Sequence, residues 1–305
     1  MKFVILILTI VSLTVSLWAQ SPADLYNEGV DLLKNQQYEQ AIEKFKAAAL
    51  ADAAHKDARL GLANAYFRLQ QWDNAIVALK EVMTLDPADT AALEMLAKAQ
   101  YNAKKYLDAI TSLEKLIGAG SDNAEFYALL GNSASANKDE IKAEKAFLKA
   151  IELKTTTVNV YHKLAIMYQK QKKTKDAIVV LEKSLPVKED QKTFYYIGRY
   201  SYLDKNYVKA EDALKKAIEL DPKDDDSMYY LVKTYIDIKK FEDAATHGEK
   251  LVLLKKDAKY YAVLGDAYRF KGDKANALKT YQEGSQYSGE HGKYCTQYVD
   301  FMKKQ

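Results

Sequence analysis

A few residues in the chain have the types that catalysis or metal binding would need. Ser112 and Lys115 have the serine-x-x-lysine spacing in which a lysine assists a serine nucleophile. The companion motifs of such enzymes are missing, and the pair falls in the middle of a predicted helix, which favours coincidence. The four histidines are scattered without the spacing of metal ligands: His55, His162, His247 and His291.

Two further candidates have simpler explanations. The acidic run at 224–226 could attract calcium, but it lacks the glycine and the distal glutamate of a calcium loop. Because it lies where a helix is expected to begin, capping of free N–H groups is the better interpretation. Cys295 is the single cysteine, so an internal disulfide is impossible, and no partnered base is suggested near it. These observations predict a protein that is not an enzyme and that has no metal and no cofactor.

The elements that carry these residues are clearest in residues 191–224. Apolar and small residues recur there at a period of 3.6 in two stripes, Phe194, Ile197, Gly198 and Ser201, then Ala210, Leu214 and Ala217. A polar turn at 204–206 separates the stripes, and Pro222 follows the second. This pattern predicts a helical hairpin in which small residues let the two backbones approach closely.

The same pattern returns about every 34 residues. It divides the chain into eight units, 22–55, 56–89, 90–123, 124–157, 158–190, 191–224, 225–257 and 258–291. Large and small residues at these offsets resemble the tetratricopeptide repeat (TPR) family. The resemblance implies an all-α, right-handed superhelical solenoid of about eight TPR hairpins. Residues 292–305 are expected to form a helix that caps the open end.

The fourth unit departs most from the pattern. Glu140 stands where an aromatic residue is expected, and residues 133–136 are all small. Gly118 and Gly120 come shortly before this unit. Since fewer large side chains bury less apolar area, we expect the junction between the third and fourth units to be the soft point of the array.

The N-terminus indicates export. Lys2 precedes an apolar run that ends near Leu17, and Ala19 follows, as in a secretory signal peptide cleaved after residue 19. A run of about 17 apolar residues is at the lower limit for crossing a bilayer, so an uncleaved membrane anchor stays the alternative. We expect the mature chain to reach the periplasm or cell envelope, and to contact a membrane only if this segment is retained.

The resemblance also implies which side chains line the concave face of the array. The family's lining positions select one apolar set in the first two units, Tyr26, Leu60, Asn64 and Phe67. In the sixth and seventh units they select aromatic residues and cations, Lys192, Tyr195, Arg199, Tyr202, Tyr229 and Lys233. His162 also falls on a lining position. None of the second set belongs to the packing stripes, so we expect these side chains to be available to a ligand.

The second set predicts a protein or peptide partner that is acidic or ends in a free carboxylate. The net charge of +3 is too small to favour nucleic acid. The leading interpretation is a non-catalytic scaffold or adaptor of the cell envelope that holds an extended peptide or a partner helix in its concave groove. A membrane-anchored structural assembly protein and an accessory organiser of an envelope enzyme are the alternatives.

Overall fold

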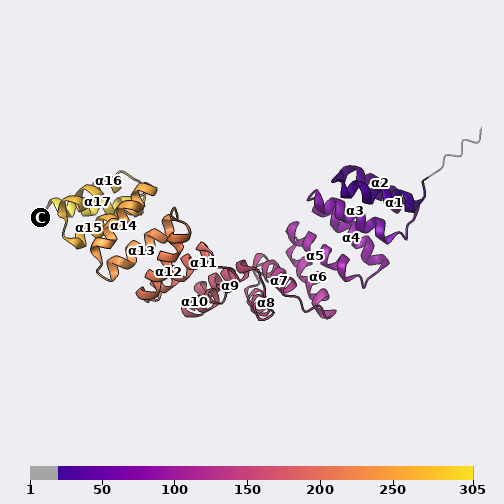
Figure 1. Cartoon of the computed structure of the whole chain (residues 1–305), viewed down its shortest axis with the longest axis horizontal. Helices are drawn as coiled ribbons and strands as arrows, with labels where there is room; N and C mark the ends of the chain where they lie inside the picture. Colours follow the sequence, from indigo (N-terminus) through magenta and orange to yellow (C-terminus); the bar gives the residue numbers. More distant parts are fainter. Residues whose placement is uncertain (1–19, 305) are drawn as a thin grey trace, which may run out of the picture. The chain divides into compact units, whose positions relative to one another are not determined.

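The computed structural model describes residues 20–304, which form seventeen helices and contain no strand (Figure 1). The helices are α1 (Pro22–Lys34), α2 (Tyr38–Ala51), α3 (Lys56–Arg68), α4 (Trp72–Leu85), α5 (Thr90–Asn102), α6 (Tyr106–Gly118), α7 (Ala124–Ala136), α8 (Glu140–Glu152), α9 (Val158–Lys170), α10 (Thr174–Glu182), α11 (Gln191–Leu203), α12 (Tyr207–Leu220), α13 (Asp225–Asp237), α14 (Phe241–Leu254), α15 (Ala258–Lys271), α16 (Lys274–Gly284) and α17 (Glu290–Lys303). The predicted signal peptide lies outside the described residues. None of the helices within 20–304 has the length and apolar character needed to cross a bilayer.

The helices pack in the order in which they occur. Each odd-numbered helix from α1 to α15 packs against the next even-numbered helix as a hairpin. Neighbouring odd-numbered helices also contact one another, as α11 does with α13 and α13 with α15. Helix α17 covers the last hairpin through contacts with α15 and α16. The prediction of an all-α array of hairpins with a capping helix is confirmed.

The chain divides into two compact units, Met1–Ser121 and Asp122–Gln305. Unit 1 contains the described helices α1 to α6, and unit 2 contains α7 to α17. The division coincides with the junction at which the sequence predicts the array to be soft.

Four of the hairpins within residues 20–304 are closed by a large side chain on the second helix that packs onto a glycine of the first. In unit 1, Phe45 is buried between two glycines. A Cβ at Gly29 or Gly61 would lie 2.7 or 2.5 Å from its ring. In unit 2 the pairs are Gly131 with Phe147, Gly198 with Leu214 and Gly265 with Tyr281. These contacts explain why glycine recurs inside the helices, since a larger residue there would collide with the facing side chain.

The turns inside the hairpins use a left-handed residue that is not glycine. At the end of α11, Lys205 has φ 59° and its N–H donates to Tyr202 O at 3.0 Å. Asn206 N–H reaches back to Ser201 O at 2.8 Å, which completes a Schellman motif. Positive φ recurs at Gln36, Gln70, Lys104, Lys138, Lys172 and Lys239, and after α8 at Lys154. In the last hairpin the position is Gly272, with φ 87°.

Candidate functional site

The structure brings the second predicted set together in unit 2. Tyr195, Arg199 and Tyr202 lie on α11, and Tyr229 and Lys233 lie on the adjacent first helix α13. These five side chains are half-buried. Lys192, at the start of α11, is exposed, and its ammonium group lies 5.8 Å from the centre of the Tyr196 ring. We call the surface formed by these residues of α11 and α13 the groove site.

The two inner cations of the groove site lie over aromatic rings. The Lys233 Nζ is 5.0 Å from the centre of the Tyr202 ring and 5.6 Å from that of Tyr229. The Arg199 guanidinium is 5.6 Å from the centre of the Tyr230 ring and donates to the Tyr195 hydroxyl at 3.4 Å. Within residues 20–304 neither cation forms an ion pair, and the buried Nε of Arg199 has no hydrogen-bond partner. Ring faces attract these cations without neutralising them.

Three tyrosines that the sequence analysis did not select complete the site. Tyr230 lies between the others, with its ring centre 6.3 Å from that of Tyr195 and 5.4 Å from that of Tyr229. Tyr196 lies 5.3 Å from Tyr195, and Tyr260 on α15 lies 5.8 Å from Tyr229. The result is a continuous row of aromatic rings from α11 to α15. Burial raises the pKa of Tyr195 to about 12, so its hydroxyl remains neutral.

The acidic run at 224–226 anchors this row. Asp224 caps α13, because its side chain accepts from Ser227 N at 3.3 Å. Asp225 accepts from the Tyr260 hydroxyl at 2.5 Å and pairs with Lys255 at 2.9 Å. Burial opposes ionisation of Asp225, but these two donors hold its pKa below the usual range. Capping is thus confirmed for Asp224, while Asp225 ties α13 to the α15 hairpin.

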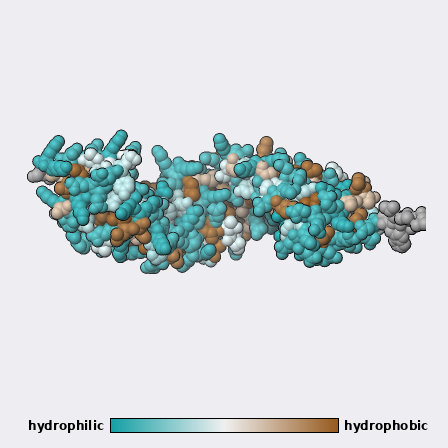
Figure 2. Space-filling model, turned by 90° about the horizontal axis from the view of Figure 1, so that it is seen from above, coloured by the Kyte–Doolittle hydropathy of each residue, from teal (hydrophilic) through white to brown (hydrophobic). Residues whose placement is uncertain are grey.

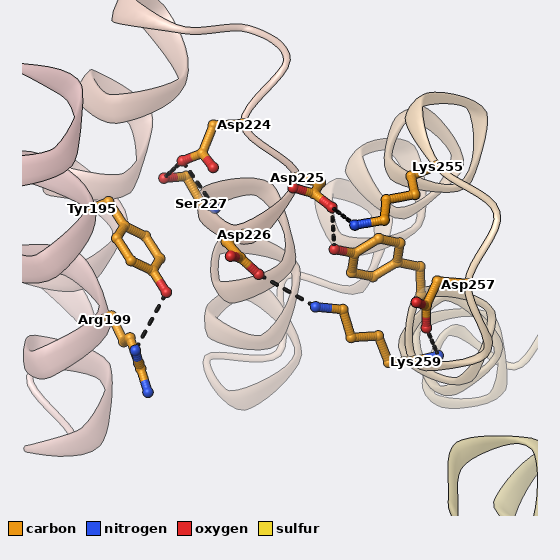
Figure 3. Close-up of polar contacts among 10 residues, drawn as sticks. Tyr195, Arg199, Asp224, Asp225, Asp226, Ser227, Lys255, Asp257 and Lys259 are labelled. Atoms are coloured by element: carbon orange, nitrogen blue, oxygen red, sulfur yellow. Dashed lines mark hydrogen bonds and ion pairs between the residues drawn. The ribbon is translucent and has the colours of Figure 1, made fainter. Parts of the chain in front are cut away.

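Figure 3 shows that Asp226 forms an ion pair, whereas Arg199 contacts only a tyrosine hydroxyl among the residues drawn. Asp226 pairs with Lys259 of α15 at 3.3 Å, so the charge of Lys259 is balanced. In the same view Tyr195 and Arg199 extend from α11 toward α13, and the only contact drawn for Arg199 is with the tyrosine hydroxyl. The positive charge of the groove site that no ion pair within residues 20–304 balances therefore comes from Arg199 and Lys233, and from the exposed Lys192 at the start of α11.

A cavity of about 340 Å³ adjoins the groove site at α13, α15 and α17. Tyr229, Lys233 and Lys259 line one part of it, and Asp266, Glu290 and Tyr294 line another. Asp266 accepts from the Tyr281 and Tyr294 hydroxyls at 2.7 and 2.8 Å and pairs with Arg269 at 3.2 Å. The charge of Asp266 is thus compensated within the fold, which leaves Lys233 as an unpaired cation at the edge of this cavity.

Two sequence-based expectations are wrong. Tyr202 and Tyr229 were expected to take no part in packing, yet both pack against the buried core of the α12–α17 region. Burial and a hydrogen bond with Asp237 raise the pKa of Tyr202. His162 was expected on the concave lining, but it is only 5% exposed, because its Nε2 lies 2.7 Å from Thr193 Oγ1 on α11. Side chains at lining positions therefore pack in part against the first helix of the neighbouring hairpin, which leaves less of their surface exposed.

The first predicted set lies in unit 1, where its side chains are half-buried. The Tyr26 ring centre is 5.9 Å from that of Phe45 and 5.2 Å from that of His55. Phe67 meets Trp72 edge-on, with ring centres 4.9 Å apart. Leu60 and Asn64 lie on α3 with Phe67, and Tyr26 lies on α1. The aromatic members of this set pack within their own unit, and the set contains no cation.

The residues that first suggested chemistry have structural roles. The Ser112 hydroxyl donates to Gln100 Oε1 at 2.7 Å in a buried contact, and Lys115 donates to Pro87 O at 3.4 Å. Cys295 is fully buried, and burial raises the pKa of its thiol to about 11, which opposes formation of the reactive thiolate. A buried hydrogen bond thus explains Ser112, and burial in the core explains Cys295.

Comparison with family models identifies repeats over much of the chain. Models described as tetratricopeptide repeat match residues 26–90, 70–132, and 124–157 with 258–291. A model described as anaphase-promoting complex, cyclosome, subunit 3, matches residues 170–251, which include the groove site. No curated protein matches the chain.

Solved structures share the fold at low sequence identity. A tetratricopeptide repeat protein from Parabacteroides merdae is 15% identical with a TM-score of 0.52, covering 81% of this chain and 98% of its own. YrrB, described as a TPR protein with an unusual peptide-binding site, is 20% identical with a TM-score of 0.52, covering 57% and 91%. MamA from Desulfovibrio magneticus is 22% identical with a TM-score of 0.51, covering 55% and 96%.

Proposed function

Since the chain is a tetratricopeptide repeat protein, we propose that it is a non-catalytic adaptor of the cell envelope that binds a protein segment at the groove site. The segment is extended and either rich in acidic residues or terminated by a free carboxylate. The observation that carries the proposal is the pair of uncompensated cations, Arg199 and Lys233, held over tyrosine rings on two adjacent helices.

The chemistry of the groove site supports an anionic partner. A carboxylate that approaches Arg199 would accept from the guanidinium, which forms no ion pair within residues 20–304. Hydrogen bonds to charged groups contribute about 1.5–3 kcal/mol each. The tyrosine row adds flat apolar surface with few rotatable bonds, so a bound segment gains contact area at low entropic cost. Because Lys233 lies over rings from both helices, one ligand could contact α11 and α13 together.

A partner can be sought by pull-down from the envelope fraction and its affinity then measured against variants. Replacing Arg199 and Lys233 together by Ala is expected to weaken binding by about 1–3 kcal/mol. Raising the salt concentration should weaken the parent complex more than the variant complex, since screening acts on the charges. Amidating the terminal carboxylate of a captured peptide separates recognition of the chain end from recognition of acidic side chains.

Lys216→Ala is the matched control. Lys216 also lies over a ring, 5.2 Å from the centre of Phe194, but it is on the second helix α12 and outside the groove site. We expect its removal to leave the affinity unchanged. If the double variant binds as tightly as the parent at low salt, the groove site is not the contact, and the set at Tyr26, Leu60, Asn64 and Phe67 becomes the candidate.

We also propose that the chain acts after export. This rests on the signal-like residues 1–19, which lie outside the described residues. Mass spectrometry of the protein isolated from its native cells measures the N-terminus directly. A mature chain that starts at Gln20 supports cleavage and release. A chain that retains Met1–Ala19 supports a protein that is anchored in the membrane by this segment.

A further inference from the structure

The cavity at α13, α15 and α17 has walls of opposite charge. Lys233 of α13 lines it on one helix, and Glu290 of α17 lines it on another. Its volume of about 340 Å³ is more than twice the roughly 150 Å³ that holds a benzene molecule in an engineered cavity. The cavity therefore has room for one side chain of a bound segment, and Ala262 and Val263 give it an apolar wall.

The other charges of this cavity are balanced within the fold. Lys259 pairs with Asp226 at 3.3 Å, and Asp266 pairs with Arg269 at 3.2 Å. Within residues 20–304, the cation of α13 and the anion of α17 that line the cavity form no ion pair. One positive and one negative charge are thus left for a ligand.

Glu290 is exposed and is the first residue of α17. The helix dipole favours a carboxylate in the first turn, which explains why an unpaired anion is tolerated here, but it does not neutralise the charge. Hydrophilic residues also cover most of the face in view in Figure 2, with hydrophobic residues in small patches among them. A cavity with charged walls in such a surface is expected to select its ligand by charge.

The unbalanced charges follow an order along the array. Helix α11 contacts α13, α13 contacts α15, and α15 contacts α17. Lys192 and Arg199 on α11 and Lys233 on α13 are positive, whereas Glu290 on α17 is negative. A segment that crosses these helices in turn meets cations first and an anion last, so its own complementary charges must change sign at the cavity.

We propose that the cavity binds a cation of the same partner segment that binds the groove site, which makes this inference rest on the proposed function. The segment then carries acidic side chains followed by a positively charged group, either a basic side chain or a free α-amino group. The Glu290 carboxylate accepts from this cation. Tyr229 and Tyr294 also line the cavity, and aromatic rings attract cations.

The test uses labelled synthetic peptides whose binding is followed by fluorescence anisotropy at low salt and at about pH 8, where histidine is neutral. One peptide has four aspartates followed by two lysines, and its partner has glutamines in place of the lysines. A second pair has the lysines or glutamines first, which covers both directions of the segment. Both ends of these peptides are blocked, and a further peptide with a free α-amino group before the aspartates distinguishes a chain end from a side chain.

The parent is expected to bind a peptide with lysines, or the one with a free amine, about three- to fivefold more tightly than the matched peptide without that cation. Net charge alone predicts the opposite, because the cations of the groove site attract the more acidic peptide more strongly. Glu290→Gln is expected to abolish the preference. Asp300→Asn is the matched control, since Asp300 is also exposed on α17 but does not line the cavity, and this variant is expected to keep the preference.

The inference is overturned if the parent shows no preference for a peptide with a cation. It is also overturned if the preference survives Glu290→Gln or is lost equally with Asp300→Asn. If the parent binds the matched peptides equally and replacing Arg199 and Lys233 by Ala weakens them all, the groove site stands and only this inference fails. If no peptide binds the parent, both proposals fail.

Discussion

Gly198 of α11 lies directly against Leu214 of α12. A Cβ placed on Gly198 would be 2.5 Å from the Leu214 Cγ and 3.2 Å from the Leu214 backbone nitrogen. In the next hairpin the sizes are exchanged, since Val232 is buried at the corresponding place on α13 and Gly248 takes the corresponding place on α14. The larger side chain of the pair is thus on the first helix, and Leu264 of α15 occupies the space beside Gly248, where a Cβ would lie 2.8 Å from its Cδ1.

Replacing Gly198 by Ala should destabilise unit 2 by about 1–3 kcal/mol, because the added methyl group meets a backbone atom as well as a side chain. Denaturant unfolding followed by circular dichroism measures the change. Gly118→Ala is the control, since no atom lies within 4 Å of its Cβ position. Equal effects of the two substitutions would show that helix propensity, rather than the contact with Leu214, governs the result.

Replacing Lys205 by Gly should stabilise the protein. Lys205 has φ 59°, a conformation that costs a residue with a side chain more than glycine. We expect a gain of about 0.5–1 kcal/mol after the greater freedom of glycine in the unfolded chain is subtracted. The reverse change, Gly272→Lys, tests the same cause in the last hairpin, where a loss of about 1 kcal/mol is expected. Changes of the same sign for both variants would contradict this account.

Stability should fall as the pH drops through the titration range of His162. Burial lowers the pKa of His162, Lys192 lowers it further, and Asp190 opposes them. Since the folded-state pKa is below the unfolded value of 6.5, the unfolded chain binds the extra proton first. The contribution of neutral His162 is therefore complete above about pH 6.5 and decreases until the pH is below the folded-state pKa.

The hydrogen bonds show which ring nitrogen of His162 carries the proton. Thr193 donates its hydroxyl proton to Asp190 at 2.9 Å, so it accepts from the Nε2–H of His162. The protonated ring keeps this donor, so the pH dependence comes from burial and not from loss of the hydrogen bond. Chemical unfolding between about pH 7 and pH 5 measures the slope. His162→Gln should flatten it, whereas His291→Gln, at an exposed position, should leave the parent slope unchanged. A parent whose stability is constant over this range would refute the prediction.

Amide hydrogens of the α7–α8 hairpin should exchange faster than those of the α3–α4 or α11–α12 hairpin. Residues 133–136 of α7 are small, and the chain divides into its two units just before this hairpin. Less apolar area is therefore available to oppose local opening. Hydrogen exchange with mass spectrometry resolves these segments. Uniform protection along the chain would contradict the prediction of a soft junction.

The hairpins could be predicted because their signals are local. Gly198 and Leu214 lie 16 residues apart in one continuous pattern, and Pro222 follows its end. The left-handed turn residues could not be predicted from residue type, because seven of the turns use Lys or Gln where glycine would have been the usual indication. In those turns the two hydrogen bonds of the Schellman motif compensate for the backbone cost.

The groove site was predicted in part. Tyr195, Arg199, Tyr229 and Lys233 come together because their positions repeat with the hairpin. Tyr230 was missed since it occupies a position next to the expected lining residue, and only the packing of α11 against α13 turns it toward Arg199. The sequence could not show which cations lack an ion pair, because ion pairs form between residues of different helices. Lys259 of α15, for example, pairs with Asp226 of α13.

The edge-on contact of Phe67 with Trp72 has an optical consequence. Trp72 is the only tryptophan within residues 20–304, and it lies in unit 1, whereas the tyrosine row of the groove site lies in unit 2. Within residues 20–304, tryptophan emission therefore reports on the α3–α4 hairpin alone, and tyrosine absorbance is dominated by the other unit. The chain thus contains its own pair of spectroscopic labels, one for each unit.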